Sequence, residues 1–409
     1  MAKDYKDLVV GLDIGTAKVM AVVAEVMPGG ELKLAGLGVS PSNGLKRGVV
    51  VNIDATVQSI QQALKEAELM ADCKITRVYT GITGSHIRGI NSSGMVAVKD
   101  KEVTPADVAR VVETARAINI STDQRLLLVE PQEFVIDGQD VKEPIGMSGI
   151  RLEAKVHIVT GAQSAAENIV KCVRRCGLEV EQLMLNPLAS AQSVLTQDEK
   201  ELGVAVVDIG AGTTDVAIFT NGAIRHTAVI PIAGDLITSD IAMALRTPTK
   251  DAEDIKVESG YAKQLLADPE QQVEVPGLGD RGPRMLSRQA LAGVIEPRVE
   301  EIFSLVQQVV RESGYEEVLS SGIVITGGSA VMPGMVELGE DIFLKPVRRG
   351  VPQYGGALSD MVGQLRAATV MGLLEEARVA RLRGFKVAQK NGSMKTAFSR
   401  FKDFIVGNF

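Results

Sequence analysis

Two glycine-centred segments combine the residue types that bind a phosphate group and a hydrated metal ion. The first, Asp13–Lys18 (DIGTAK), and the second, Asp208–Asp215 (DIGAGTTD), each follow an apolar run. Glycines let backbone N–H groups approach an anion, threonine hydroxyls add donors, and Mg²⁺ prefers a few carboxylates and several waters. We therefore predict that both segments bind one phosphate chain and its Mg²⁺. The predicted phosphate ligands are Gly15, Thr16, Lys18, Gly210, Gly212, Thr213 and Thr214, and Asp13 and Asp208 are predicted to hold Mg²⁺ through water.

Both segments join two strands rather than a strand and a helix. Apolar residues 8–12 and 19–26 flank the first, and residues 203–207 and 216–220 flank the second. A P-loop or a dinucleotide-binding fingerprint would place its glycines between a strand and a helix. One such hairpin is usually only a turn, but two copies that share the Asp-Ile-Gly start indicate an internal duplication with a common role. We expect the hairpin glycines to use their freedom to adopt positive φ.

A third glycine turn ends the apolar run 323–326 and comes shortly before Pro333, which favours the start of a helix. Taken alone, it would be an ordinary connection between a strand and a helix. Beside two phosphate-binding hairpins, it is predicted to hold the base and ribose of a nucleotide. The residues assigned to this role are Gly327, Gly328 and Ser329.

Composition limits the classes of protein that fit the chain. Its 409 residues predict two to three domains, and a net charge of −7 with 3% aromatic residues and no Trp argues against a nucleic-acid partner. Three cysteines form no disulfide framework and fit a reducing cytosol. No apolar stretch is long enough to span a membrane, so we expect a protein that stays on the cytoplasmic side.

The C-terminal end differs chemically from the rest of the chain. Between Arg378 and Phe409 there are eight basic residues and one acid, Asp403. Residues 394–409 show apolar side chains at helical spacing, and this helix is too short and too charged to span a bilayer. We predict that it lies in the interface of an anionic membrane, or, as the alternative, that it docks on the protein's own body. The predicted membrane-facing residues are Met394, Phe398, Phe401, Phe404 and Ile405, and the polar stretch 385–393 is predicted to be a flexible linker.

The two hairpins and the third turn, in this order, resemble the actin-like ATPase superfamily. Within it the chain resembles the FtsA family of bacterial cell-division proteins, and the resemblance covers almost the whole sequence. The matching runs are Gly11–Lys18, Ala67–Cys73, Gly149–His157, Glu201–Asp215, Ala252–Val257, Val294–Arg298 and Gly322–Gly328, together with the amphipathic C-terminal end.

The resemblance implies an α/β fold with two actin-like lobes, which are duplicated ribonuclease-H-like domains, and an inserted subdomain called 1C. The implied boundaries are residues 1–84 and 161–200 for the first lobe (1A), 85–160 for 1C, 201–229 and 305–352 for the second lobe (2A), 230–304 for its small subdomain (2B), 353–384 for a return to the first lobe, 385–393 for the linker and 394–409 for the membrane-targeting helix.

The resemblance also implies ATP or ADP with Mg²⁺ as cofactors, with Glu253 and Lys256 of 2B beside the ribose and adenine. It implies an adaptor that binds the FtsZ C-terminal tail, anionic lipids, later division proteins and further copies of itself, on the cytoplasmic face of the inner membrane at the septum. An acidic and apolar FtsZ tail requires a basic surface, and the candidates are Arg284, Arg288 and Arg298. A small-molecule kinase or a chaperone-like ATPase of the same superfamily is the alternative.

One feature of the superfamily is missing. Hydrolytic members carry a Gln or Glu near the start of the first connecting helix, whereas this chain has Asn186, with Gln192 further along. An amide can orient water but is a weak base. The sequence therefore predicts ATP binding and at most slow hydrolysis.

Overall fold

The computed structural model describes residues 7–279 and 281–390 and shows two lobes, each built on a five-stranded sheet. The strand orders are β11-β6-β1-β2-β3 and β18-β17-β12-β13-β14, with three parallel strands followed by two antiparallel ones in both sheets. The duplication therefore extends from the hairpins to the whole sheets. The strands are β1 (Leu8–Ile14), β2 (Lys18–Val26), β3 (Leu32–Pro41), β6 (Arg77–Ile82) and β11 (Glu179–Leu185) in the first lobe, and β12 (Val204–Ile209), β13 (Thr214–Thr220), β14 (Ala223–Ile230), β17 (Ile323–Thr326) and β18 (Val347–Arg349) in the second.

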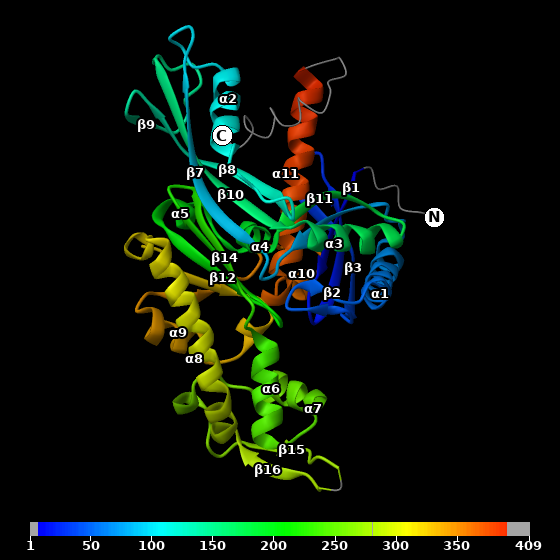
Figure 1. Cartoon of the computed structure of the whole chain (residues 1–409). Helices are drawn as coiled ribbons and strands as arrows, with labels where there is room; N and C mark the ends of the chain where they lie inside the picture. The colour runs from blue at the N-terminus through cyan, green and yellow to red at the C-terminus, as the bar shows by residue number, and fades with distance from the viewer. Residues whose placement is uncertain (1–6, 280, 391–409) are drawn as a thin grey trace.

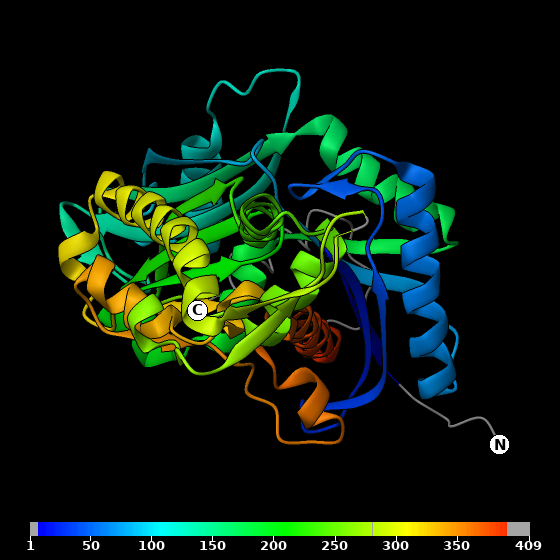
Figure 2. The same ribbon diagram turned by 90° about the horizontal axis from the view of Figure 1, so that it is seen from below.

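The first lobe is covered on one face by α1 (Ile53–Ala71), which lies against β2 and β3, and by α3 (Gln163–Arg175) (Figure 2). Asn52 caps the N-terminus of α1, where its side-chain carbonyl accepts a hydrogen bond from the N–H of Ala55. Gly38 on β3 allows the close approach of this helix, since a Cβ there would lie 1.9 Å from the carbonyl oxygen of Ala63. A short hairpin, β4 (Leu45–Lys46) and β5 (Val49–Val50), connects β3 to α1.

Two helices cross between the lobes. These are α4 (Asn186–Val194) and α11 (Ala368–Lys390). At the crossing, a Cβ on Gly372 would lie 1.6 Å from the carbonyl oxygen of Ala189, so only glycine fits there. The short helix α5 (Gln197–Leu202) follows α4 in the sequence, and the short helix α10 (Ser359–Val362) precedes α11.

The predicted linker at 385–393 is wrong in its first part. Helix α11 continues through residues 385–390, because the chain offers no Gly or Pro between Gly384 and Asn391 and Ala, Gln and Lys favour helix. Residues 391–393 and the whole predicted membrane helix, 394–409, lie outside the described residues. No described helix is long and apolar enough to cross a membrane.

The inserted subdomain projects from the top of the molecule in Figure 1. Its sheet has the order β7-β10-β8-β9 and is covered by α2 (Pro105–Arg116). Thr104 and Asp107 form a capping box at the start of this helix, and Pro105 occupies its first turn. The strands are β7 (Arg88–Ala97), β8 (Gln124–Ile136), β9 (Gln139–Val141) and β10 (Arg151–Ala162).

The small subdomain of the second lobe projects in the opposite direction (Figure 1). It shares one hydrophobic core with the second-lobe sheet, in which Phe303 packs on Phe343 with ring centroids 5.1 Å apart. Its elements and those next to it are α6 (Gly234–Leu245), α7 (Thr249–Ser259), β15 (Gln272–Val275), β16 (Arg284–Ser287), α8 (Arg288–Ser313) and α9 (Met335–Phe343).

Candidate functional site

The two glycine hairpins have the same backbone geometry. In the first, the N–H of Gly15 donates to the carbonyl oxygen of Lys18 over 2.9 Å, and in the second, the N–H of Gly210 donates to that of Thr213, also over 2.9 Å. The strand–turn–strand prediction is therefore confirmed for both copies. When the two hairpins are aligned on these hydrogen bonds, Lys18 corresponds to Thr213 and Ala17 corresponds to Gly212.

The hairpins of the two lobes meet at Gly212. A Cβ there would lie 2.6 Å from the Thr16 Oγ1 and 2.8 Å from the Arg47 Cα. The Thr16 hydroxyl also accepts a hydrogen bond from the N–H of Gly48 over 3.1 Å, so the β4–β5 hairpin closes over the first turn. The structure thus brings together the hairpins that the sequence predicts to share one ligand.

The expectation of positive φ at the hairpin glycines is wrong. Gly15, Gly210 and Gly212 are not among the described residues with positive φ. Close packing, rather than backbone conformation, explains why position 212 is a glycine, because any side chain there would push the two hairpins apart. Positive φ is found in the third turn, where Gly327 has a φ of 91° and a Cβ would lie 2.3 Å from the Asp208 Oδ1.

The third turn and the start of α6 both contact the second hairpin. The Ser329 hydroxyl donates to the carbonyl oxygen of Gly210 over 2.7 Å, and the N–H of Gly234 donates to the same oxygen over 3.2 Å. A Cβ on Gly234 would lie 2.3 Å from the Ser329 Oγ. Gly234 was not predicted to belong to the site. The available signal was a glycine four residues after the end of β14, at the start of the next helix.

Hydroxyl groups from both crossing helices hold Asp208. Ser190 of α4 and Thr369 of α11 donate to its Oδ2, the latter over 3.2 Å. Neither residue was predicted as a site residue, because each lies far from Asp208 in the sequence. The small residues of the two helices favour a close crossing, but no local pattern indicates their contact with Asp208.

The centre of the site is buried and strongly charged. Burial, opposed by Lys18 and reinforced by Asp208, raises the pKa of Asp13 to about 6, and burial lowers the pKa of Lys18 to about 8. Burial and the neighbouring Asp208 raise the pKa of Asp215 to about 8. Three carboxylates crowded out of water favour a cation between them. Among the described residues, no group of three His, Cys, Asp or Glu side chains is arranged to hold a metal ion directly.

Two contacts tie the site to segments outside the hairpins. The Lys18 ammonium donates to the carbonyl oxygen of Arg366, just before α11. The Thr83 hydroxyl donates to the Asp215 Oδ1. Thr83 is followed by Gly84 and then by the inserted subdomain, so the second hairpin contacts the point where that subdomain joins the first lobe.

Glu253 and Lys256 lie together on α7 and face α6. The Lys256 ammonium is buried and donates to the Glu253 carboxylate over 2.6 Å, to the Thr238 hydroxyl over 2.8 Å and to the carbonyl oxygen of Gly234 over 3.1 Å. Because Gly234 touches the second hairpin, this cluster supports the wall of the site. Its predicted contact with ribose and adenine stays a prediction.

The three arginines predicted to hold the FtsZ tail lie in or next to the small subdomain, and all of them have partners within the chain. Arg284 donates to the carbonyl oxygen of Leu245, and Arg288 donates to that of Ser259 over 2.9 Å. Arg298 forms a two-pronged ion pair with Asp240, over 2.6 and 3.1 Å. An acidic peptide that bound Arg298 would therefore compete with Asp240.

The two amides considered for positioning water are placed differently. Gln192 points away from the hairpins and donates to the Glu376 carboxylate over 3.0 Å. The Oδ1 of Asn186 packs against β6, where a Cβ on Gly81 would lie 2.1 Å from it. With its amide bonded to Glu376, Gln192 does not reach the hairpins.

Comparison with known proteins places this geometry in a family. The model of cell division protein FtsA matches residues 205–372, and that of the SHS2 domain inserted in FtsA matches residues 84–160. The chain is 55% identical to a cell division protein FtsA of Pseudomonas aeruginosa over 98% of both chains. It is 53% identical to one of Neisseria meningitidis, over 94% of this chain and 93% of the other.

Solved structures with low sequence identity share the two-lobed actin-like fold. A PilM–PilN type IV pilus biogenesis complex matches with a TM-score of 0.66 at 17% identity, over 90% of this chain and 98% of the other. MreB5 of Spiroplasma citri bound to AMPPNP matches with a TM-score of 0.56 at 16% identity, over 95% and 99%. A MamK double helical filament matches with a TM-score of 0.53 at 13% identity, over 91% and 99%.

Proposed function

Because the chain belongs to the FtsA family of bacterial cell division proteins, we propose that it is an ATP-binding adaptor that attaches FtsZ polymers to the cytoplasmic face of the inner membrane at the division septum. The observation that carries this proposal is the extent of the similarity, since the alignment with a cell division protein FtsA covers 98% of this chain and 98% of the other. The adaptor also binds copies of itself and recruits later division proteins.

The site supports ATP, or ADP, with Mg²⁺ as the bound group. Two hairpins that touch at Gly212, a Lys18 ammonium and three buried carboxylates form a cradle for a phosphate chain and its cation. Bound Mg²⁺ would screen the phosphate charge, while Ser190 and Thr369 hold Asp208 in place. With Gln192 turned away, any hydrolysis is slow and the nucleotide acts mainly on conformation.

The membrane anchor is assigned to residues 394–409. Three Phe and one Ile on one helical face give at most about 10 kcal/mol if fully buried, and partial immersion leaves a few kcal/mol. Basic residues near an anionic leaflet add about 1 kcal/mol each. One copy therefore binds reversibly, and several copies in a polymer bind firmly through avidity. The filament formed by MamK, which has the same fold, supports this self-association.

The decisive experiment is sedimentation of the full chain with anionic liposomes, with and without ATP and a peptide of the FtsZ tail. We expect the protein to pellet with the liposomes and to carry the peptide with it. Phe401→Glu places a charge in the centre of the apolar face and should leave the protein in the supernatant with unchanged ATP affinity. Ser399→Glu, on the opposite side of the helix, is the matched control. Equal pelleting of the two variants would show that the helix is not the anchor. That result is expected if the protein is a small-molecule kinase, which needs no membrane anchor.

The Arg298–Asp240 ion pair allows a sharper test of the FtsZ-tail surface than a single charge reversal. Arg298 pairs with both Asp240 and Glu301, so Arg298→Glu alone brings three carboxylates together and can damage the fold. The double variant Arg298→Glu with Asp240→Arg restores the pair between positions 298 and 240 with reversed polarity. If Arg298 binds the tail, the double variant should keep its stability but still bind the peptide at least about tenfold more weakly. Full recovery of peptide affinity would assign Arg298 a structural role only.

A further inference from the structure

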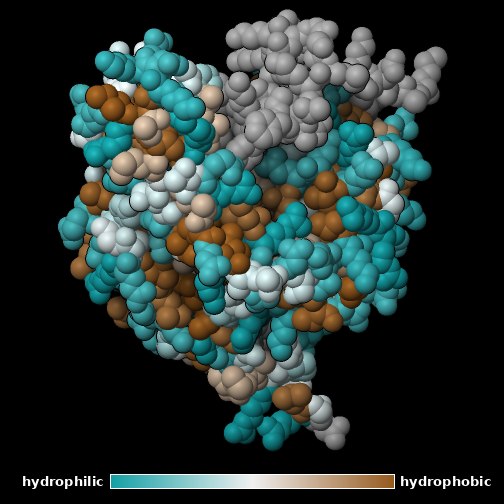
Figure 3. Space-filling view, turned by 45° about the horizontal axis from the view of Figure 1, so that its top comes forward, coloured by the Kyte–Doolittle hydropathy of each residue, from teal (hydrophilic) through white to brown (hydrophobic). Residues whose placement is uncertain are grey.

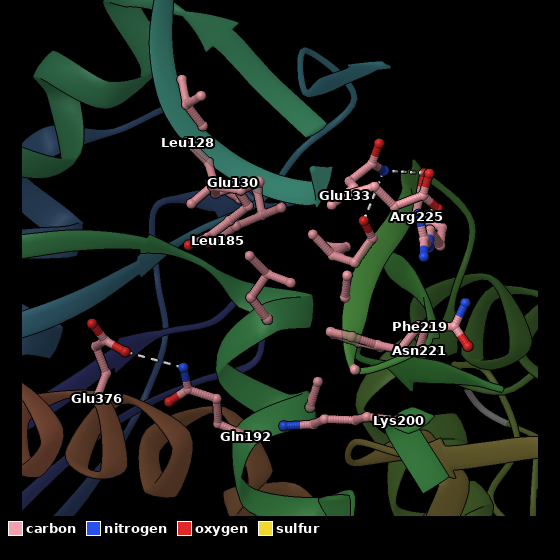
Figure 4. A pocket seen from close by; sticks show the side chains of 18 of the residues that line it. Leu128, Glu130, Glu133, Leu185, Gln192, Lys200, Phe219, Asn221, Arg225 and Glu376 are labelled. Carbon is pink, nitrogen blue, oxygen red and sulfur yellow. Dashed lines mark hydrogen bonds and ion pairs between the residues drawn. The ribbon is translucent and has the colours of Figure 1, made fainter. Parts of the chain in front are cut away.

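A large groove lies away from the nucleotide hairpins, between the inserted subdomain and the two lobes (Figure 4). Its volume is about 1110 Å³. Its walls are β8, the end of β11, α4, the turn between β13 and β14, and α11. Sites for small molecules usually measure about 300–1,000 Å³, so the size of this groove suits a peptide segment better than a small ligand.

The groove is lined by apolar side chains together with more acidic than basic ones. Leu128, Leu185 and Phe219 line it from three different elements (Figure 4). Acidic side chains outnumber basic ones among its lining residues, seven to five. In Figure 3 apolar side chains lie on the face shown, below the inserted subdomain at the upper left. This combination fits an amphipathic segment with a basic polar face.

One unsatisfied polar atom lies inside the groove. The Gln192 amide donates to Glu376, but its carbonyl oxygen is buried and has no hydrogen-bond partner among the described residues. Buried polar atoms are rarely left without a partner, because the loss costs about 1–3 kcal/mol. A donor from a bound segment would satisfy this oxygen.

Helix α11 forms one wall of the groove and connects it to the C-terminal residues of the chain. Glu375, Glu376, Val379 and Arg383 of α11 line the groove, and α11 continues for about 10 Å beyond Arg383 to Lys390. The remaining residues, 391–409, are therefore attached at the edge of the groove. A short connection of this kind corresponds to an effective concentration in the millimolar range.

We propose that this groove binds residues 394–409 of the same chain, with Phe398, Phe401 and Phe404 facing inward. The segment 391–409 carries Lys395, Arg400 and Lys402 against one acid, Asp403, so its charge is opposite to that of the groove. The same apolar face cannot be buried in the groove and in lipid at once. This inference rests on the proposed function of the segment as a membrane anchor, and it makes the groove and the membrane competitors for one helix.

Val379→Glu is the variant that tests the groove with the least risk to the fold. Val379 is partly exposed on α11 and contributes to none of the five hydrophobic cores formed by the described residues. Leu69→Glu is the control, because Leu69 is an exposed apolar residue on α1 outside the groove. Both variants add one negative charge on a helix.

The first measurement is hydrogen exchange of the full chain without lipid. We expect amides of 394–409 to exchange at least about tenfold faster in Val379→Glu than in the parent and in Leu69→Glu. Exchange of this segment at the rate of an unstructured peptide in all three proteins would overturn the proposal. Protection that rises with protein concentration would also overturn it, since a second copy would then fill the groove.

The second measurement is binding to anionic liposomes. Val379→Glu should bind several-fold more tightly than the parent, although its added charge alone would weaken binding to an anionic surface, and Leu69→Glu should not. Unchanged or weaker binding of Val379→Glu contradicts the competition. If the parent fails to bind liposomes while its tail is protected in a Val379-dependent way, the groove assignment stands and the membrane anchor fails. If it binds liposomes without any protection, the anchor stands and the groove assignment fails.

Discussion

The two nucleotide hairpins share a backbone but differ in what their turns supply. In the first lobe the turn exposes Ala17 and ends in the cation Lys18. In the second lobe the corresponding positions are Gly212, which is buried against the first hairpin, and Thr213. After duplication the backbone was kept, while one copy came to supply charge and the other came to supply space and hydroxyl groups. The first copy can therefore tolerate changes of size, and the second cannot.

The largest effect is expected from adding a methyl group to the second hairpin. Gly212→Ala places a Cβ 2.6 Å from the Thr16 Oγ1 and forces the hairpins apart. We expect calorimetry to show a loss of ATP affinity of at least about 100-fold, or about 3 kcal/mol. The corresponding change in the first hairpin, Ala17→Gly, should alter affinity less than about threefold. Similar affinities for the two variants would show that the hairpins do not close on one ligand.

A smaller effect is expected where the two hairpins differ in charge. Lys18→Met removes a charged donor, for which about 1.5–3 kcal/mol is usual, so ATP should bind about 10- to 150-fold more weakly. Thr213→Val, at the corresponding position, removes a neutral donor and should cost only about two- to tenfold. Equilibrium titration with a fluorescent ATP analogue measures both. A larger loss for Thr213→Val would reverse the assignment of roles.

The second lobe also contacts the inserted subdomain, and a buried histidine at this contact makes the stability of the protein depend on pH. His157 of β10 is buried between Asn91 and Thr227, with its Nε2 2.9 Å from the Thr227 Oγ1 of β14. Burial lowers the pKa of His157 from 6.5 to about 4. Protonation of His157 therefore disfavours the folded state. The contribution of this histidine to stability is complete above pH 6.5 and falls as the pH drops from 6.5 towards 4, by at most about 1.4 kcal/mol per pH unit.

The pH effect is measured by thermal unfolding between pH 7 and pH 5. His157→Gln keeps polar atoms at the interface but cannot be protonated, so its stability should fall less steeply than that of the parent. His226 also has a pKa lowered by burial, so part of the slope remains in the variant. Identical slopes for parent and variant would contradict the assignment to His157.

The smallest effect is expected from the hydroxyls that hold Asp208. Ser190→Ala removes one donor while Thr369 still binds the carboxylate, so the Mg²⁺ concentration needed for half-maximal ATP binding should rise about two- to fivefold. Ser193→Ala is the control, because the Ser193 hydroxyl donates to the carbonyl oxygen of Ala368 and not to Asp208. An equal shift in the two variants would mean that Ser190 acts only on the packing of α4.

Local patterns in the sequence were sufficient to predict the hairpins and their turns. The Asn221-Gly222 pair, which is typical of a tight hairpin turn, has φ of 54° and 75°. The Thr104 cap of α2 and the close crossing at Gly372 were also predictable, because each depends on residue types that few other structures require. These features are encoded within a few residues of one another.

The remaining features of the site depend on contacts between distant segments. Ser190 and Thr369 reach Asp208 from two helices, and Thr83 reaches Asp215 from the first lobe, at separations that no local pattern records. The conformations of the hairpin glycines were mispredicted for the same reason, since the constraint on Gly212 comes from Thr16 and Arg47 of the other lobe. The groove likewise forms only when three subdomains are assembled.

The crossing of α4 and α11 has a mechanical consequence. At Gly372 and Ala189 the two helices touch backbone to backbone. Side chains of α4 also donate hydrogen bonds to α11 on both sides of this contact, from Ser193 to the carbonyl oxygen of Ala368 and from Gln192 to Glu376. These bonds resist rotation, so the crossing angle changes only when they are exchanged, and the backbone contact is then the pivot. A small change of angle at this pivot is multiplied by distance. The inserted subdomain and the small subdomain, which project in opposite directions, are where such a rotation would produce the longest travel (Figure 1).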